Sequence, residues 1–139
     1  MSGSSTHGLL DTSTLVLLGR IADPATVPEV PLISAVTLAE LTIGPLVATD
    51  DAQRVARQAH LQQAEADFEP LAFDAGVARR FGHVAASLGR SGRKPVARTF
   101  DAMIAATALA HDPPVHTCNP SDFAGIDDLT VVAVPHPGA

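Results

Sequence analysis

The stretch from Arg98 to His111, RTFDAMIAATALAH, constrains the fold of this chain more than any other. Its alanines and methionine favour a helix, Pro95 stands just upstream, and Thr99 is the candidate N-cap. Ten residues without a formal charge follow Asp101, counting His111 as neutral. A helix that is apolar on nearly every side is a buried one, so we predict a core helix here. Asp101 then stands in its first turn, either as a partner of the helix dipole or as a functional acid.

Length and composition predict one folded domain. A chain of 139 residues can bury a real core, and its 46% hydrophobic and 17% charged residues argue against disorder. No apolar run reaches membrane-spanning length and no basic leader opens the chain, so we expect a cytoplasmic protein with no membrane contact. The single Cys118 excludes an internal disulfide and a cysteine-cluster zinc site. We expect a flexible terminus over residues 1–7, a domain over 8–134 and a tail over 135–139.

Charge is distributed unevenly along the chain. The net charge of −6 argues against nucleic-acid binding, which depends on neutralising phosphates. However, six of the nine basic residues lie in one segment that leads to Asp101, namely Arg79, Arg80, Arg90, Arg93, Lys94 and Arg98. This segment is either a nucleic-acid contact or an ordinary solvated helix and loop.

Strand and helix patterns alternate along the chain. A short apolar run ends at Asp11 and predicts a buried strand, with a helix opening at Thr12 or Ser13. Further strands are expected at 31–34, 70–73, 115–118 and 130–134, and further helices at 35–43, 50–68 and 74–88. The alternation predicts an α/β fold with a mainly parallel central sheet and helices on both faces.

Two of the predicted helices raise specific questions. Thr37 and Glu40 have the spacing of a capping box, which would place a helix start there. Alternatively the helix begins at Ser34, and Glu40 is then a buried acid that needs a partner such as a cation. In the helix at 50–68, we expect a surface-lying helix whose apolar face includes Val55, Ala59, Leu61 and Phe68. His60 on that helix is expected to be solvated.

Four acids follow or open these elements. Asp11 ends the first strand, Glu40 lies in the following helix, Asp101 opens the core helix, and Asp122 follows the strand at 115–118. In open α/β sheets, ligands bind beyond the carboxyl ends of the strands, where these acids would meet. Clustered carboxylates repel unless a cation joins them, and oxygen ligands suit Mg²⁺ or Mn²⁺. Such ions serve phosphoryl chemistry.

The stretches LLDTSTLV, ISAVTLAEL, RTFDAMIAATALAH and HTCNPSDF together resemble the PIN domain, and more narrowly the VapC toxins of bacterial toxin–antitoxin pairs. The resemblance spans about residues 8 to 134 and implies a three-layer α/β/α fold and a Mg²⁺-dependent ribonuclease. It implies metal binding by Asp11, Asp101 and Glu40. The fourth position falls to Asp122 or Asn119, and we expect the charged Asp122 to matter more. Thr12, Ser13 and Thr117 match polar residues that surround the family's metal site.

The resulting hypothesis is a toxin that hydrolyses RNA phosphodiester bonds, with Asp11, Glu40, Asp101 and Asp122 as its catalytic acids. Arg90, Arg93, Lys94 and Arg98 are expected to contact the RNA. The resemblance also implies a cognate VapB-type antitoxin and a homodimer, and an arginine of the antitoxin would suit the acidic pocket. Two alternatives stay open: another metal-dependent phosphoester hydrolase, and a catalytically silent α/β interaction module.

Overall fold

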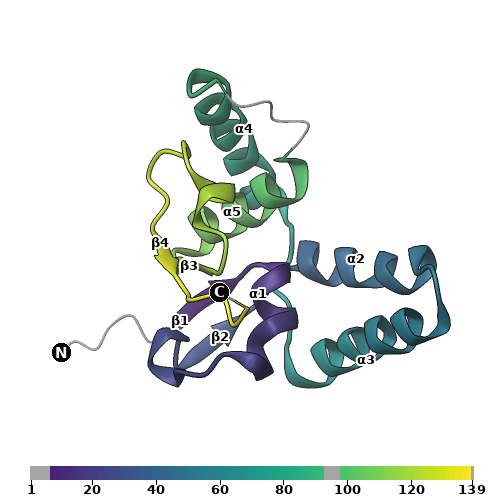
Figure 1. Ribbon diagram of the computed structural model, residues 1–139. Coiled ribbons are helices and arrows are strands. Elements are labelled where there is room, and N and C mark those ends of the chain that lie inside the picture. Colours follow the sequence, from purple (N-terminus) through teal and green to yellow (C-terminus); the bar gives the residue numbers. More distant parts are fainter. Residues whose placement is uncertain (1–6, 93–97, 139) are drawn as a thin grey trace.

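The sheet at the centre of the molecule has four parallel strands in the order β2-β1-β3-β4. The computed structural model describes residues 7–92 and 98–138. The strands are β1 (His7–Leu10), β2 (Val30–Leu32), β3 (Val115–Thr117) and β4 (Val131–Ala133). The first strand therefore lies inside the sheet, between β2 and β3, although β3 comes some hundred positions later in the chain (Figure 1).

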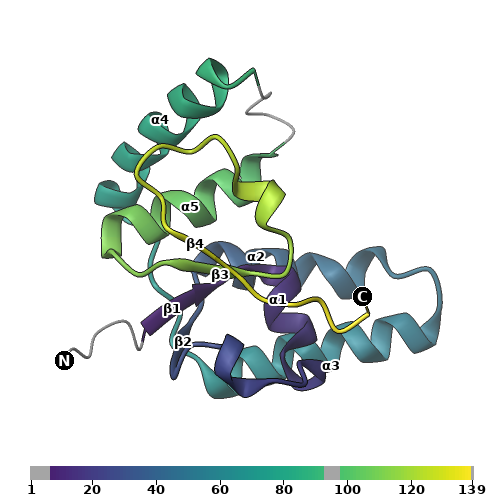
Figure 2. The same cartoon turned by 60° about the vertical axis from the view of Figure 1, so that its left-hand side comes forward.

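Helices cover both faces of the sheet. The α-helices are α1 (Thr12–Leu17), α2 (Ala35–Ile43), α3 (Asp51–Asp67), α4 (Ala75–Arg90) and α5 (Thr99–His111). Short 3-10 turns are η1 (Leu18–Arg20), η2 (Pro24–Thr26), η3 (Gly44–Val47) and η5 (Pro120–Phe123). Figure 2 shows α4 and α5 on one side of the sheet and α1 and α3 on the other. The predicted three-layer α/β/α fold is confirmed.

Alternation along β1 assigns its two neighbouring leucines to different cores. Leu9 faces the cluster built around α4 and α5, with Val84, Ile104 and Phe123 among its members. Leu10 faces a smaller cluster with Ile33, Leu41 and Ala64, on the side of α1 and α3. Because both faces of β1 are packed, both leucines are fully buried. Asp11, the next residue, is therefore fixed at the end of a strand that cannot shift.

The core helix α5 is confirmed, but its predicted cap is wrong. Its buried residues run from Ala102 to Ala108 with one exception, as expected for a helix without a polar face. Thr99 is the first helical residue rather than the N-cap, and Arg98 takes the cap position without a capping hydrogen bond. The arginine side chain bonds to Asp122 instead. The guanidinium has no acceptor atom, so Arg98 could not cap the helix with its side chain, and the helix simply begins one residue earlier than the capping rule predicted.

Two other expectations need correction. The stretch 70–73 is not a strand: only Leu71 forms a single bridge, to Ser34, because Pro70 offers no N–H and the chain turns at once into the cap of α4. On α3, Val55 is 69% exposed and Ala59 is also exposed, so they do not share the packed face with Leu61 and Phe68. The first half of α3 lies against η3 as part of a projecting helical hairpin, and only its second half reaches the core (Figure 1).

The described residues begin in β1 and end after β4. The expected flexible terminus falls on residues 1–6, which lie outside the described residues, while His7 already belongs to β1. Residues 135–138 follow β4 without helix or strand. Within the described ranges, every helix is too short or too polar to cross a membrane.

Candidate active site

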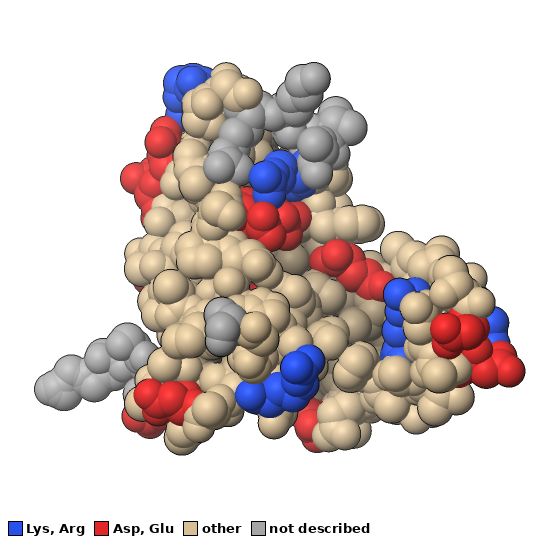
Figure 3. All heavy atoms as spheres, viewed as in Figure 1, with Lys and Arg blue, Asp and Glu red and all other residues tan. Residues whose placement is uncertain are grey.

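The four acids occupy the end of the sheet that the carboxyl termini of β1 and β3 share. Asp11 follows β1 and caps α1, Glu40 lies in α2, Asp101 stands in the first turn of α5, and Asp122 lies in η5 after β3. We call these four residues the acid cluster. Figure 3 shows acidic side chains, with basic ones beside them, gathered where the α2–α3 hairpin meets the rest of the molecule. The order of the strands thus brings together acids from four separate segments.

Asp11 is the most buried of the four, with 3% of its surface exposed. Its Oδ2 accepts a hydrogen bond from Thr117 Oγ1 at 2.9 Å and another from Ser13 Oγ at 3.3 Å. Its Oδ1 accepts the backbone N–H of Thr14 at 3.3 Å, so the same carboxylate caps α1. Asp11 therefore serves as a helix cap, and this does not exclude a second role. Neutral donors orient the carboxylate and leave its charge uncompensated.

Glu40 is held by a chain of two hydroxyl groups. Thr12 Oγ1 donates to Glu40 Oε1 at 2.6 Å and lies 3.0 Å from Thr37 Oγ1. Burial raises the pKa of Glu40, the hydrogen bond from Thr12 opposes that rise, and the charge of Asp11 adds to it. The helix begins after Ser34, whose Oγ accepts the N–H of Thr37, so the capping box between Thr37 and Glu40 does not form. Sequence reasoning missed the role of Thr37 because its threonine partner lies 25 positions away.

Asp101 shows that the acids act on one another. Its pKa is raised from the ordinary value of 3.8 to about 6. Burial is the largest cause, followed by the negative charges of Asp122, Asp11 and Glu40, while Arg98 lowers the pKa. All three other acids therefore lie near enough to disfavour ionisation of Asp101. The cluster expected from the sequence is a single electrostatic unit.

Asp122 differs from the other acids because it has a charged partner. Its Oδ1 accepts a hydrogen bond from Arg98 Nη1 at 2.7 Å, and each of the two side chains is about one-third exposed. Phe123, the next residue, is buried in the main core and anchors this turn. The ion pair therefore stands on rigid supports, with α5 on one side and η5 on the other.

Asn119, the other candidate for the fourth position, supports Asp11 indirectly. Its Nδ2 donates to Ser13 Oγ at 3.1 Å, and its backbone N–H donates to Thr117 Oγ1 at 2.9 Å. Both of these hydroxyl groups contact Asp11. Thr14, which the sequence did not single out, is fully buried and accepts the N–H of Cys118, so it ties α1 to the end of β3. Each polar residue that the resemblance implied thus contacts an acid or its immediate partner.

The donor set is the kind that a hard divalent cation prefers. It consists of carboxylate oxygens, partly buried and mutually repelling, and a cation would relieve the repulsion. Over residues 7–92 and 98–138, no three acidic, histidine or cysteine side chains already converge closely enough to enclose an ion. The charge and chemistry of the cluster fit Mg²⁺ or Mn²⁺.

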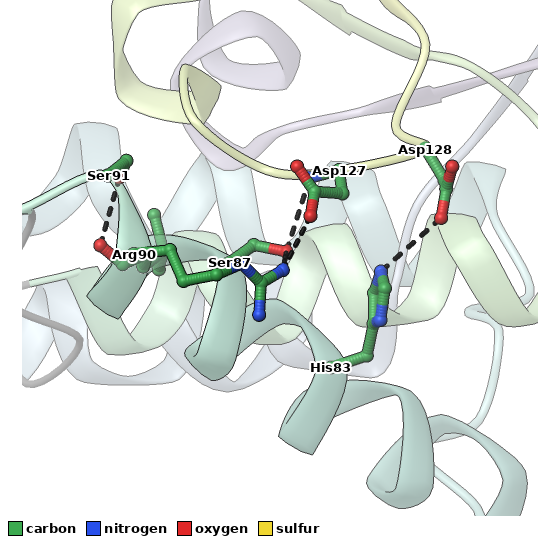
Figure 4. Close-up of polar contacts among 7 residues, drawn as sticks. His83, Ser87, Arg90, Ser91, Asp127 and Asp128 are labelled. Carbon is green, nitrogen blue, oxygen red and sulfur yellow. Dashed lines mark hydrogen bonds and ion pairs between the residues drawn. The ribbon is translucent and has the colours of Figure 1, made fainter.

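The basic residues expected to contact RNA have different surroundings. Arg98 lies at the acid cluster, as described. Arg90, near the end of α4, pairs with Asp127 and lies beside Ser87, while His83 on the same helix lies 3.5 Å from Asp128 (Figure 4). These contacts fasten the segment between η5 and β4 to α4. The remaining two, Arg93 and Lys94, lie outside the described residues.

Comparison with known proteins places the chain in a family. A sequence profile of the PIN domain matches residues 9–129. The chain belongs to the PIN domain family. It is 37% identical over 136 residues to Ribonuclease VapC5 of Mycobacterium tuberculosis (strain ATCC 25618 / H37Rv), covering 96% of this chain and 98% of that protein. The resemblance to VapC-type proteins seen in the sequence is confirmed.

Solved structures agree with the family assignment. A crystal structure of a member of the VapBC family of toxin–antitoxin systems, VapBC-5 from Mycobacterium tuberculosis, matches with a TM-score of 0.79 and 36% identity, over 93% of this chain and 99% of that one. VapBC2 from Rickettsia felis, crystallised with a DNA fragment from its promoter, matches with a TM-score of 0.72 over 90% of this chain and 96% of that one. At 22% identity, the second match supports the fold alone.

Proposed function

We propose that this PIN domain protein is the toxin of a toxin–antitoxin pair and acts as a Mg²⁺-dependent endoribonuclease. The observation that carries the proposal is the meeting of four acids from separate segments at one end of the sheet, where burial and the charges of the other three raise the pKa of Asp101. A fold that holds four carboxylates against their own repulsion is prepared for a cation. The 37% identity to a ribonuclease over nearly the whole chain supports the same reaction class. Because its substrate is RNA, we place the protein in the cytoplasm.

In this proposal three acids bind the metal and neighbouring hydroxyl groups orient them. Asp11, Asp101 and Glu40 would hold the metal, which would supply activation of water and stabilisation of charge on the phosphate. Ser13 and Thr117 fix the orientation of Asp11, and Thr12 fixes that of Glu40. Well-oriented ligands matter because small displacements cost much of the rate. The functional domain, as proposed, extends over residues 8–134.

The RNA path is proposed to run past the basic residues near α5. Arg98 lies at the acid cluster, and Arg90, Arg93 and Lys94 precede it in the chain. Replacing Arg90, Arg93 and Lys94 together with glutamine should weaken RNA binding and flatten its salt dependence, while cleavage persists at high RNA concentration. An unchanged salt slope would place the RNA path elsewhere.

A VapB-type antitoxin is the proposed partner, and the protein is proposed to form a homodimer. Support for the antitoxin comes from the match to a VapBC structure and from an apolar cavity of about 460 Å³ on the side of α1 and α3. Leu15, Leu18, Leu41 and Phe68 are among its lining residues. A second cavity, of about 360 Å³, shares Leu41 with the first and includes Glu40. An apolar helix of the antitoxin would fit this groove, and a basic residue of it would meet Glu40.

The experiment that tests the function is an RNA cleavage assay with purified protein, with Mg²⁺ and with EDTA. Asp101→Asn and Glu40→Gln should each abolish cleavage while the protein stays folded. Asp51→Asn is the matched control, because Asp51 also stands in the first turn of a helix but lies outside the acid cluster. Cleavage that survives in folded Asp101→Asn would refute the site. Hydrolysis of small phosphoesters but not of RNA would favour a different hydrolase.

A further inference from the structure

The ion pair between Arg98 and Asp122 lies at the acid cluster. Its partners are 24 residues apart, and the Nη1–Oδ1 distance is 2.7 Å. Arg98 is the cap residue of α5, whose first turn carries Asp101, and Asp122 lies in η5, which packs against α5. The pair therefore stands at the edge of the acid cluster, where a phosphate would have to arrive.

Arg98 also differs from the other arginines whose contacts the structure describes. Arg54 pairs with Asp51 along α3, Arg57 donates to the carbonyl of Gly44, and Arg90 pairs with Asp127. Only Arg98, of the basic side chains in the described ranges, acts on Asp101. A phosphodiester approaching carboxylates is repelled and needs a cation close to them. Arg98 is in place for that task, but Asp122 occupies its guanidinium.

We propose that Arg98 is the phosphate-binding residue of the site and that Asp122 holds its guanidinium in position until an RNA phosphate displaces the carboxylate. The inference rests on the proposed ribonuclease function and deepens it. It makes Asp122 a positioning residue in the RNA-free protein, with its charge committed to Arg98. When the phosphate takes its place, the carboxylate of Asp122 is released beside the other three acids.

Exchange is physically reasonable because the two anions are similar. Carboxylate and phosphate both accept paired hydrogen bonds from an arginine, so a phosphate can replace Asp122 on the same donors. Both side chains of the pair are about one-third exposed, so the pair can open without disturbing the core. Ion pairs of this kind are weak, and we expect the competition from Asp122 to lower RNA affinity by only about two- to fivefold.

The test measures RNA binding in EDTA, so that binding is separated from cleavage. Wild type, Asp122→Asn, Arg98→Gln and the double variant are titrated into a labelled single-stranded RNA, and fluorescence anisotropy gives the dissociation constants. Asp122→Asn should tighten binding about two- to fivefold, because Arg98 is freed from its competitor. Arg98→Gln should weaken binding, and adding Asp122→Asn to it should restore almost nothing. The slope of log affinity against log salt should steepen by about 0.7 in Asp122→Asn, because one more counterion is released.

The control separates exchange from a general loss of negative charge. Asp51→Asn also removes an acid from beside an arginine, but on α3 and outside the acid cluster. It should leave RNA affinity nearly unchanged. An equal gain in Asp51→Asn, or a gain from Asp122→Asn that persists without Arg98, would overturn the inference, as would no gain at all. Thermal melts establish that each variant is folded.

Failure of the inference can be told apart from failure of the function. Wild-type cleavage of the same RNA with Mg²⁺ is measured in parallel. If wild type cleaves and the Asp122→Asn gain is absent, the exchange is wrong and the ribonuclease assignment stands. If wild type neither cleaves nor binds RNA, the proposed function fails and the exchange fails with it.

Discussion

Removing the charge of Asp101 should stabilise the metal-free protein while it abolishes activity. The rise of the Asp101 pKa from 3.8 to about 6 corresponds to a gross cost of about 3 kcal/mol for keeping this group ionised at neutral pH. Because the side chain is partly exposed, solvent screening reduces that cost, and we take about half of it. Asparagine also forfeits a favourable helix-dipole interaction of about 0.5 kcal/mol. The net expectation is that Asp101→Asn raises the free energy of unfolding by about 1 kcal/mol at pH 7 and above.

The stability gained in Asp101→Asn should depend on pH. The folded-state pKa of Asp101 lies above the unfolded value, so ionisation opposes folding. The advantage of asparagine should be complete above pH 6, shrink as the pH falls from 6 towards 3.8, and be absent below that. Urea unfolding of both proteins in EDTA, repeated across this pH range, measures it. Asp51→Asn is the control and should be slightly destabilising, because it loses a helix-dipole partner and an exposed ion pair with Arg54. A stability difference that is unfavourable, or that does not change with pH, would refute the electrostatic account of the cluster.

Three further predictions concern packing, titration and orientation. Gly8→Ala should destabilise the fold by about 1–3 kcal/mol, because a Cβ there would lie 2.3 Å from the ring of His116. A Cβ at Gly82 on α4 would meet nothing within 4 Å, so Gly82→Ala should stabilise the fold by about 1 kcal/mol. Urea unfolding measures both changes. Burial lowers the pKa of His116, so protonation below pH 6.5 favours the unfolded state. The contribution of His116 to stability should be constant above pH 6.5 and be lost as the pH falls below that value. The difference in unfolding free energy between wild type and His116→Asn should show this loss. Thr37→Val should raise the Mg²⁺ concentration needed for cleavage about tenfold, because the hydroxyl chain to Glu40 loses a member, and Thr37→Ser should not.

The sequence predicted those features that short stretches encode by themselves. The uncharged run after Asp101 predicted a buried helix, and α5 is buried over most of its length. The apolar pair Leu9 and Leu10 predicted a buried strand, and it occupies the middle of the sheet. The alternation of strands and helices predicted the layers, and the layers predicted that acids at strand ends would meet. Such patterns predict where a helix or strand lies in the fold, because apolar segments are buried in the core.

What the sequence did not predict depends on contacts between distant segments. The pairing of Arg98 with Asp122 joins residues 24 positions apart, and a local pattern cannot contain it. Likewise, Thr12 meets Thr37 only because α1 and α2 pack together. The exposed Val55 shows the same limit: a helical period can mark a face as apolar, but it does not say whether the rest of the protein reaches that face.

The partners of the acids explain why this site is suited to a cation. Asp11 and Glu40 are oriented by hydroxyl groups, which are neutral and leave each carboxylate its full charge. Among the described residues, Asp122 is the one acid of the cluster that forms an ion pair with an arginine. An arginine between Asp11, Glu40 and Asp101 would neutralise part of their negative charge and weaken the attraction for a metal ion. No arginine in the described part of the chain forms an ion pair with Asp11, Glu40 or Asp101, so their repulsion remains and contributes to the raised pKa of Asp101. A divalent ion would remove this repulsion, and in the proposed exchange the arginine at the rim passes from Asp122 to the phosphate.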